Sequence, residues 1–296
     1  MKLDGTTSLW IAATVLLYTR GEELLSRGEK AAKTLDPEDI HDLRVASRRL
    51  GEGLALFASC YPPEVIRAMG KKVKKVTRFL GDIRNADEAI LFFTDLAAEL
   101  DDDCRRDLEP FLDGCHDDRE RTVRGLKNGI RKITEGSLPD LYLKTLNSLT
   151  LFASADKGIN LFSPLSGFAG YALDQRLSTI RELLPQARGA GAIEAQHRLR
   201  IAVKRFRYRM ELLSFLFEAE YPPLHGVVKS YQDVLGTMHD LDVFGGIVRE
   251  ADFPAETEKM LLDAITAQRE KLFSDFCRML EEQPLEQICE RVRSLV

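Results

Sequence analysis

Long hydrophobic runs are missing from this 296-residue chain, and cysteines are few. No apolar stretch approaches the roughly 18 residues that a membrane-spanning helix requires. The five cysteines are widely spaced and include no Cys-x-x-Cys pair, which argues against a disulfide scaffold or a zinc ribbon and favours reduced thiols. We therefore expect a globular protein of the cytoplasm that does not contact membranes.

The apolar stretch Leu9–Tyr18 near the N-terminus is short, and no small-residue cleavage site follows it. It continues into the charged segment Arg20–Lys33. This pattern predicts an amphipathic core helix rather than a signal peptide.

Motifs for catalysis are also scarce. The chain has no Gly-rich phosphate loop, no Gly-x-Ser-x-Gly elbow and no pair of catalytic carboxylates. Alternating Val/Ile/Thr segments bounded by tight turns are missing too, whereas apolar residues recur at spacings of three and four. We expect an all-α fold, no cofactor, no metal and no enzymatic activity.

The chain is internally duplicated. The decapeptide His41–Leu50 recurs 156 residues later as His197–Phe206, and the two copies share their pattern of basic and apolar residues. From the histidine to a following Leu-Gly pair there are 39 residues in the first copy and 38 in the second. We expect one domain over 1–296, made of the helical halves 1–155 and 165–296 and joined within 153–170. The further shared landmarks are Tyr61-Pro62-Pro63 with Leu80-Gly81, and Tyr221-Pro222-Pro223 with Leu235-Gly236.

Each decapeptide predicts a helix with one apolar face and one basic face. At roughly 100° per residue, an apolar face opposes a wedge formed by His41, Arg44 and Arg48. The second copy repeats the wedge with His197, Arg200, Lys204 and Arg207, and places Tyr208 beside it. Each proline pair is expected to end its helix, and the next helix to pack antiparallel on it. The expected core residues are Leu43, Leu50, Leu54 and Phe57 in the first copy and Leu199, Phe206, Met210 and Leu213 in the second.

Charge is segregated along the chain, although the net charge is only −5. The segment between Ala195 and Met210 contains six Lys/Arg residues and no acid, and Lys71–Arg78 contains five in eight positions. In the second segment Lys71, Lys74, Lys75 and Arg78 share one wedge, opposite Val73, Val76 and Leu80. A third stripe comprises Arg124, Lys127 and Arg131.

Helix faces that are merely solvated mix Glu with Lys, because like charges at i,i+4 repel. Basic stripes without acids therefore favour a repeating polyanion as ligand. His41 and His197 would donate to phosphate when protonated, which predicts pH dependence near neutrality. The alternative for both histidines is a local hydrogen bond to a carboxylate such as Asp42.

These landmarks resemble the CHAD domain (conserved histidine α-helical domain) family. The match rests on His-x-x-Arg-x-x-x-Arg/Lys-Arg at His41 and His197 and on the Leu-Gly elements, and it covers nearly the whole chain in two halves. The resemblance implies two pseudo-symmetric antiparallel four-helix bundles around a basic central cleft that binds inorganic polyphosphate. It also implies association with polyphosphate granules, and a triphosphatase or other polyphosphate-metabolising protein as a partner. The chain is too fully occupied by the two halves to include a triphosphatase domain.

The expected polyphosphate ligands combine the basic stripes with the positions that match the family motif. Two departures predict unequal halves. Gly51, a weak helix former, stands where the second half has Arg207, and Asn85 stands where it has Asp240. The candidates are His41, Arg44, Arg48, Arg49, Lys71, Lys74, Lys75, Arg78, Arg124, His197, Arg200, Lys204, Arg205, Arg207 and Tyr208.

Three alternatives remain open. The doublets His41-Asp42 and His239-Asp240 are of the kind that holds metals in helical phosphohydrolases, but further ligands would have to converge on them. Basic helices also track nucleic-acid backbones, although Tyr208 is the one aromatic residue in the basic tracts placed to stack on a base. The third alternative is a scaffold that recruits partner proteins.

Overall fold

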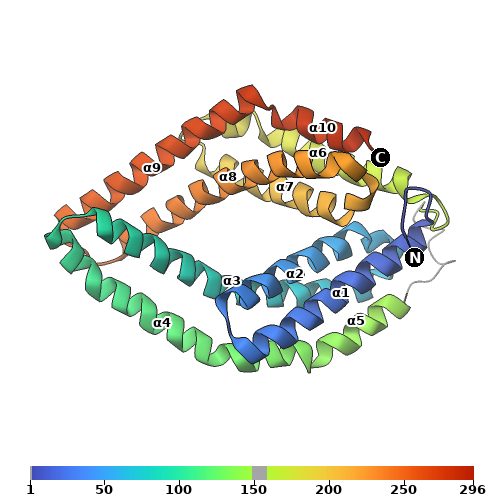
Figure 1. Ribbon diagram of the computed structural model, residues 1–296, viewed down its shortest axis with the longest axis horizontal. Helices are drawn as coiled ribbons and strands as arrows, with labels where there is room; N and C mark the ends of the chain where they lie inside the picture. The colour runs from blue at the N-terminus through green and yellow to red at the C-terminus, as the bar shows by residue number, and fades with distance from the viewer. Residues whose placement is uncertain (1, 149–158) are drawn as a thin grey trace. The chain divides into compact units, whose positions relative to one another are not determined.

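The computed structural model describes residues 2–148 and 159–296, and those residues form helices joined by short turns, with no strand (Figure 1). One isolated bridge pairs Ser8 with Pro164. The predicted all-α fold is confirmed. The helices are α1 (Leu9–Thr34), α2 (Pro37–Leu56), α3 (Pro63–Glu99), α4 (Asp102–Thr134), α5 (Ser137–Asn147), α6 (Leu165–Leu183), α7 (Ile193–Leu212), α8 (Tyr221–Glu250), α9 (Ala255–Glu282) and α10 (Leu285–Ser294).

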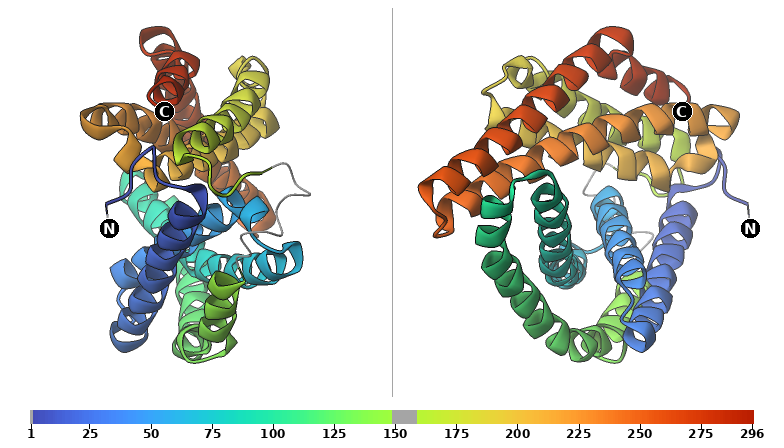
Figure 2. Two further views of the ribbon diagram at one scale, coloured as in Figure 1. Left: turned by 90° about the vertical axis from the view of Figure 1, so that its right-hand side faces the viewer. Right: turned by 60° about the vertical axis from the view of Figure 1, so that its left-hand side comes forward.

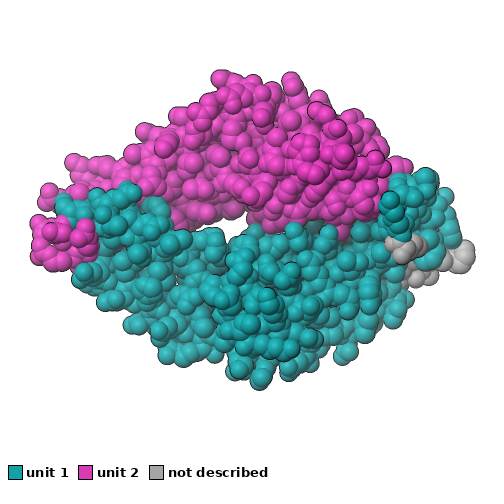
Figure 3. Space-filling model, viewed as in Figure 1, with its two compact units in different colours: residues 1–101, 108–165 teal, residues 102–107, 166–296 magenta. Residues whose placement is uncertain are grey.

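The chain divides into two compact units, coloured separately in Figure 3. Unit 1 comprises residues 1–101 and 108–165, and unit 2 comprises 102–107 and 166–296. The first six residues of α4 thus group with unit 2, where Thr257 Oγ1 donates to Asp107 Oδ2 at 2.5 Å. Part of the expected junction, residues 153–158, lies outside the described residues.

Each unit follows the same order of four long helices and a short fifth one, α1–α5 in unit 1 and α6–α10 in unit 2. Within unit 1, α1 packs on α2 and α2 on α3, and α1 and α2 lie side by side in Figures 1 and 2. Within unit 2, α7 packs on α8 and α8 on α9. The short helices are fixed to the long ones, α5 to α3 and α1, and α10 to α8.

Helix α1 is a core helix, as its pattern predicts. Its residues Leu9, Leu16, Leu17 and Leu24 are buried against the rest of unit 1. Gly21 lets the ring of Tyr142 from α5 approach the α1 backbone, where the Tyr142 hydroxyl donates to the Tyr18 carbonyl at 2.7 Å. None of the helices in 2–148 and 159–296 is long and apolar enough to cross a bilayer.

The proline pairs begin helices instead of ending them, so that expectation was wrong. Helix α2 ends at Leu56 and α3 begins at Pro63, while α7 ends at Leu212 and α8 begins at Tyr221, just before its own proline pair. A proline lacks the amide hydrogen that a helix interior needs, but the first turn of a helix does not use that hydrogen. The pairs are therefore N-terminal signals for α3 and α8.

Candidate functional site

Helices α2 and α7 are each the second helix of their unit. Each has 20 residues, and His41 and His197 are each the fifth residue of their helix. The weak helix former Gly51 does not interrupt α2, which continues to Leu56. All eight residues predicted for the two core faces are buried, which confirms the expected orientation: Leu43, Leu50, Leu54, Phe57, Leu199, Phe206, Met210 and Leu213.

In unit 1 the α2–α3 register places Arg44 over the Leu-Gly element. The hydroxyls of Ser47 and Thr77 lie 2.9 Å apart, and Arg44 Nε lies 3.9 Å from where a Cβ on Gly81 would be. Arg44 lies near Gly81, and Ser47, three residues later on α2, lies near the earlier α3 residue Thr77. The two helices therefore run antiparallel, as predicted. The Arg44 side chain thus lies within van der Waals range of the α3 backbone at the Leu-Gly element.

In unit 2 the α7–α8 register is set by polar pairs. His197 Nδ1 lies 3.0 Å from His239 Nδ1, and Arg207 Nε donates to Gln232 Oε1 at 2.8 Å. These helices are also antiparallel. The Nε atom of Arg200 is buried, like that of its counterpart Arg44, although both residues are only half-buried as a whole. Packing thus restrains the same arginine in both units.

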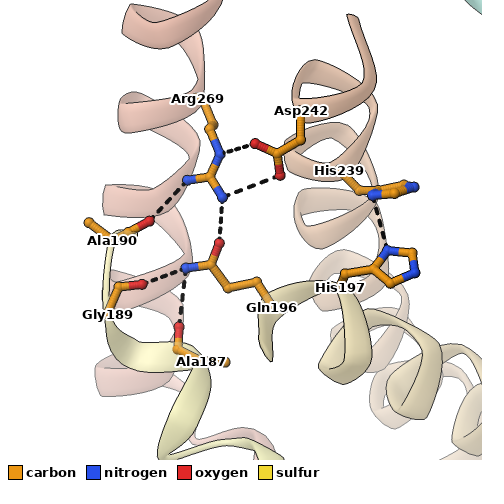
Figure 4. A network of polar contacts seen from close by, with 8 residues as sticks. All are labelled: Ala187, Gly189, Ala190, Gln196, His197, His239, Asp242 and Arg269. Atoms are coloured by element: carbon orange, nitrogen blue, oxygen red, sulfur yellow. Dashed lines mark hydrogen bonds and ion pairs between the residues drawn. The ribbon is translucent and has the colours of Figure 1, made fainter. Parts of the chain in front are cut away.

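His197 and His239 form a pair between α7 and α8 (Figure 4). Their ring centroids are 4.2 Å apart. Burial lowers the pKa of His239 to about 4, and the positive charges of Arg200, His197 and Lys204 act in the same direction. Burial, followed by the charge of Arg200, also lowers the pKa of His197. At neutral pH both rings are neutral, so one Nδ1 donates to the other.

A network on α7, α8 and α9 holds the start of α7 in place (Figure 4). Gln196 Nε2 donates to the carbonyls of Ala187 and Gly189, and Gln196 Oε1 accepts from Arg269 at 2.6 Å. Arg269 Nε also donates to Asp242 Oδ1 at 2.5 Å. Because Gln196 precedes His197, these contacts fix the position from which the His197 ring projects.

Unit 1 contains an equivalent ion pair, in which Arg119 Nε of α4 donates to Asp87 Oδ1 of α3. Asp87 and Asp242 both follow the leucine of their Leu-Gly element by seven residues. Sequence comparison of the two halves could have identified these aspartates, but their arginine partners lie on helices without a shared motif. The pairs tie the third helix of each unit to the fourth.

The histidine pair itself is confined to unit 2. The position of His239 relative to the Leu-Gly element is occupied in unit 1 by Arg84, whose Nε donates to Glu88 at 2.7 Å. The Asp42 carboxylate, considered as a partner for His41, instead forms an ion pair with Arg27 at 2.7 Å. His239 was missed as a site residue because its sequence context suggested only a His-Asp doublet.

Three candidates take part in contacts within their own unit. Arg207 is bonded to Glu211 at 2.7 Å and lies over the Tyr208 ring at 5.0 Å from its centroid. Tyr208 is only 6% exposed, so its ring is not presented for stacking on a base. Arg49 pairs with Glu23 of α1 at 3.1 Å. These side chains contribute to packing and to internal charge balance.

The other basic candidates range from half-buried to exposed. Arg205 is exposed on α7, and Arg48 and Lys204 are half-buried on their helices. On α3, the buried residues Val73, Val76 and Leu80 confirm the predicted core side of the lysine-rich segment. The exposed candidates on α3 and α4 are Lys71, Lys74, Lys75, Arg78 and Arg124.

No group of three or more His, Cys, Asp or Glu residues able to hold a metal occurs in the described ranges. Asp102 and Asp103 lie in the first turn of α4, where the helix dipole favours acids, and each pairs with an arginine three residues on. His197 and His239 are therefore not part of such a group among the described residues.

Comparisons with known proteins agree with this architecture. The family described as the CHAD domain matches residues 19–249. The CHAD domain from the plant Ricinus communis has a similar structure, with a TM-score of 0.66 at 19% identity over 100% of this chain and 93% of that one. PptA from Streptomyces chartreusis has a TM-score of 0.72 at 14% identity over 96% of this chain and 100% of that one. At these identities the two likenesses concern the fold. No curated protein sequence matches the chain.

Proposed function

Because the chain belongs to the CHAD domain family, we propose that it binds inorganic polyphosphate and does not hydrolyse it. The observation that carries this proposal is the repetition of one basic face in both units. His41, Arg44 and Arg48 on α2 correspond to His197, Arg200 and Lys204 on α7, on helices of equal length with buried opposite faces.

The chemistry of these faces suits phosphate. An arginine offers a planar fork that matches phosphate oxygens, and a lysine offers a compact charge. The buried Nε atoms of Arg44 and Arg200 restrain both guanidinium groups, so less side-chain entropy is lost when an anion binds. Two such faces on one chain favour a long polyanion over a single phosphate, since the second contact becomes intramolecular.

The ligand set that we propose is narrower than the one expected from the sequence, and it includes His239. Arg49 and Arg207 are left out because Glu23 and Glu211 already neutralise their charges, and Tyr208 is left out because it is buried. The proposed set is His41, Arg44, Arg48, Lys71, Lys74, Lys75, Arg78 and Arg124 in unit 1, and His197, Arg200, Lys204, Arg205 and His239 in unit 2.

The decisive experiment is charge reversal on α7. Lys204→Glu with Arg205→Glu should weaken long-chain polyphosphate binding by at least about tenfold, because each replacement turns an attraction into a repulsion. The matched control is Lys259→Glu with Lys271→Glu, two exposed lysines of α9 outside the proposed set. Normal binding by a folded α7 variant would refute the assignment of α7.

Binding would also determine where the protein resides and with what it associates. We propose that it is cytoplasmic and joins polyphosphate granules, together with a triphosphatase or another polyphosphate-metabolising protein. A fluorescently tagged chain should concentrate on granules, and the α7 double variant should not. Equal granule labelling by both would show that recruitment is independent of this face.

A further inference from the structure

A cavity of about 430 Å³ lies within unit 1, among α3, the end of α4 and the start of α5. This volume falls in the range of roughly 300–1,000 Å³ that is typical of small-molecule sites. The polyphosphate proposal does not require this cavity. Its lining residues, on these three helices and in the turn between α4 and α5, are Lys72, Lys75, Val76, Phe79, Gly129, Lys132, Ile133, Gly136, Ser137 and Leu138.

The deep side of the cavity is apolar. Val76, Ile133 and Leu138 are buried residues from three different helices, and Phe79 adds an aromatic ring. Gly129 is required for this arrangement, because a Cβ at that position would lie 2.3 Å from the Phe79 ring. The ring therefore packs directly against the backbone of α4.

The outer side of the cavity is cationic. Lys72, Lys75 and Lys132 are exposed there, and Lys72 Nζ donates to Ser137 Oγ at 2.8 Å. None of the described residues that line the cavity is acidic. The start of α5 adds little to this charge, because its first turn contains Pro139, which has no N–H, and the acidic Asp140. The cationic character of the cavity therefore comes from the three lysines.

We propose that this cavity binds a small amphipathic anion, with an apolar chain or ring on the deep side and a single carboxylate or phosphate at the lysines. Polyphosphate does not fit this description, because it has no apolar part to bury against Val76, Phe79 and Ile133. The cavity and the polyphosphate site therefore differ in the ligand that they bind. Lys75 belongs to both the cavity and the basic segment of α3.

The test is a calorimetric titration of the full chain with decanoate, decyl phosphate and decanol. Both anions should bind saturably with one site per chain, and decanol should bind more weakly. The double variant Lys75→Glu with Lys132→Glu should weaken the binding of both anions by about tenfold. The affinity for decanol should be unchanged, because only the charge contacts are lost. The control Arg67→Glu with Lys144→Glu alters exposed cations of α3 and α5 that do not line the cavity, and should change nothing.

A second variant tests the location independently of charge. Ser137→Trp should fill the opening and abolish binding of the anions and of decanol, whereas Ser137→Ala should retain them. Polyphosphate binding by the Ser137→Trp protein should be unchanged, which separates this proposal from the one for α7. Decanoate that fails to saturate, or that binds Ser137→Trp like the unmodified chain, would overturn the proposal.

Discussion

His197 and His239 face each other through their Nδ1 atoms at 3.0 Å, one on α7 and one on α8. Two protonated rings could not share this contact, since each Nδ1 would then carry a hydrogen. Arg200 and Lys204 oppose protonation of both rings, while Glu194 and Asp242 favour a charge on His197. The pair is thus neutral in the free protein and able to gain a proton when an anion arrives.

Polyphosphate affinity should accordingly rise as the pH falls. Bound phosphate would offset the charges of Arg200 and Lys204 and raise the pKa of His197, so binding takes up a proton. Between about pH 8 and about pH 6, the dissociation constant should fall several-fold, with the proton uptake visible by calorimetry in buffers of different ionisation enthalpy. His197→Gln should reduce this dependence because it removes the ring that takes up the proton, and His116→Gln, at an exposed position of α4, should not. A pH-independent affinity in the unmodified chain would contradict this role.

The same pair should affect stability in acid. The pKa of His239 is about 4 in the folded chain, below the ordinary value of about 6.5 that applies to the unfolded chain. The unfolded state therefore binds more protons in this window, and the free energy of unfolding falls as the pH drops from about 6.5 towards 4. Urea unfolding of the His239→Gln protein should show a shallower decline over the same range. Identical slopes would indicate that His239 is not buried in this way.

The ion pair between Asp242 and Arg269 should stabilise unit 2 by fixing Gln196. Both side chains are mostly buried, so Asp242→Asn or Arg269→Met should each cost about 1–3 kcal/mol in the free energy of unfolding. The double variant should lose less free energy of unfolding than the two single variants lose together. A double-mutant cycle measured by chemical denaturation tests this. Strict additivity would mean that the two side chains do not interact in solution.

Gly21 should be essential for docking α5 onto α1. A Cβ there would lie 2.1 Å from the Tyr142 ring, so Gly21→Ala should destabilise the protein by about 1–3 kcal/mol through overpacking. The control Gly125→Ala lies at an exposed position in α4 with open space around it, and should instead stabilise by about 0.5–1 kcal/mol. Thermal unfolding would compare the two, and a neutral Gly21→Ala would argue against this packing.

Helix faces were predictable from the sequence because spacing along one helix determines them. Leu43 and Leu199 are buried where the 3.6-residue period places them. Contacts between helices were harder to predict, since they depend on register. His239 joins His197 only because α8 packs antiparallel on α7 at one particular offset. On a helical wheel Tyr208 lies beside the basic wedge, but in the structure it is buried beneath Arg207. A helical wheel does not predict this burial, because it depends on neighbouring helices.

The most direct test of the central claim is competition between polyphosphate and RNA for the unmodified chain. Both polymers should carry the same number of phosphates and be titrated at about 50 mM and about 200 mM salt. Polyphosphate binding should weaken steeply with salt, RNA should displace little polyphosphate, and no phosphate should be released when a divalent metal is added. Equal displacement by RNA would identify a general polyanion surface, and metal-dependent phosphate release would identify a hydrolase.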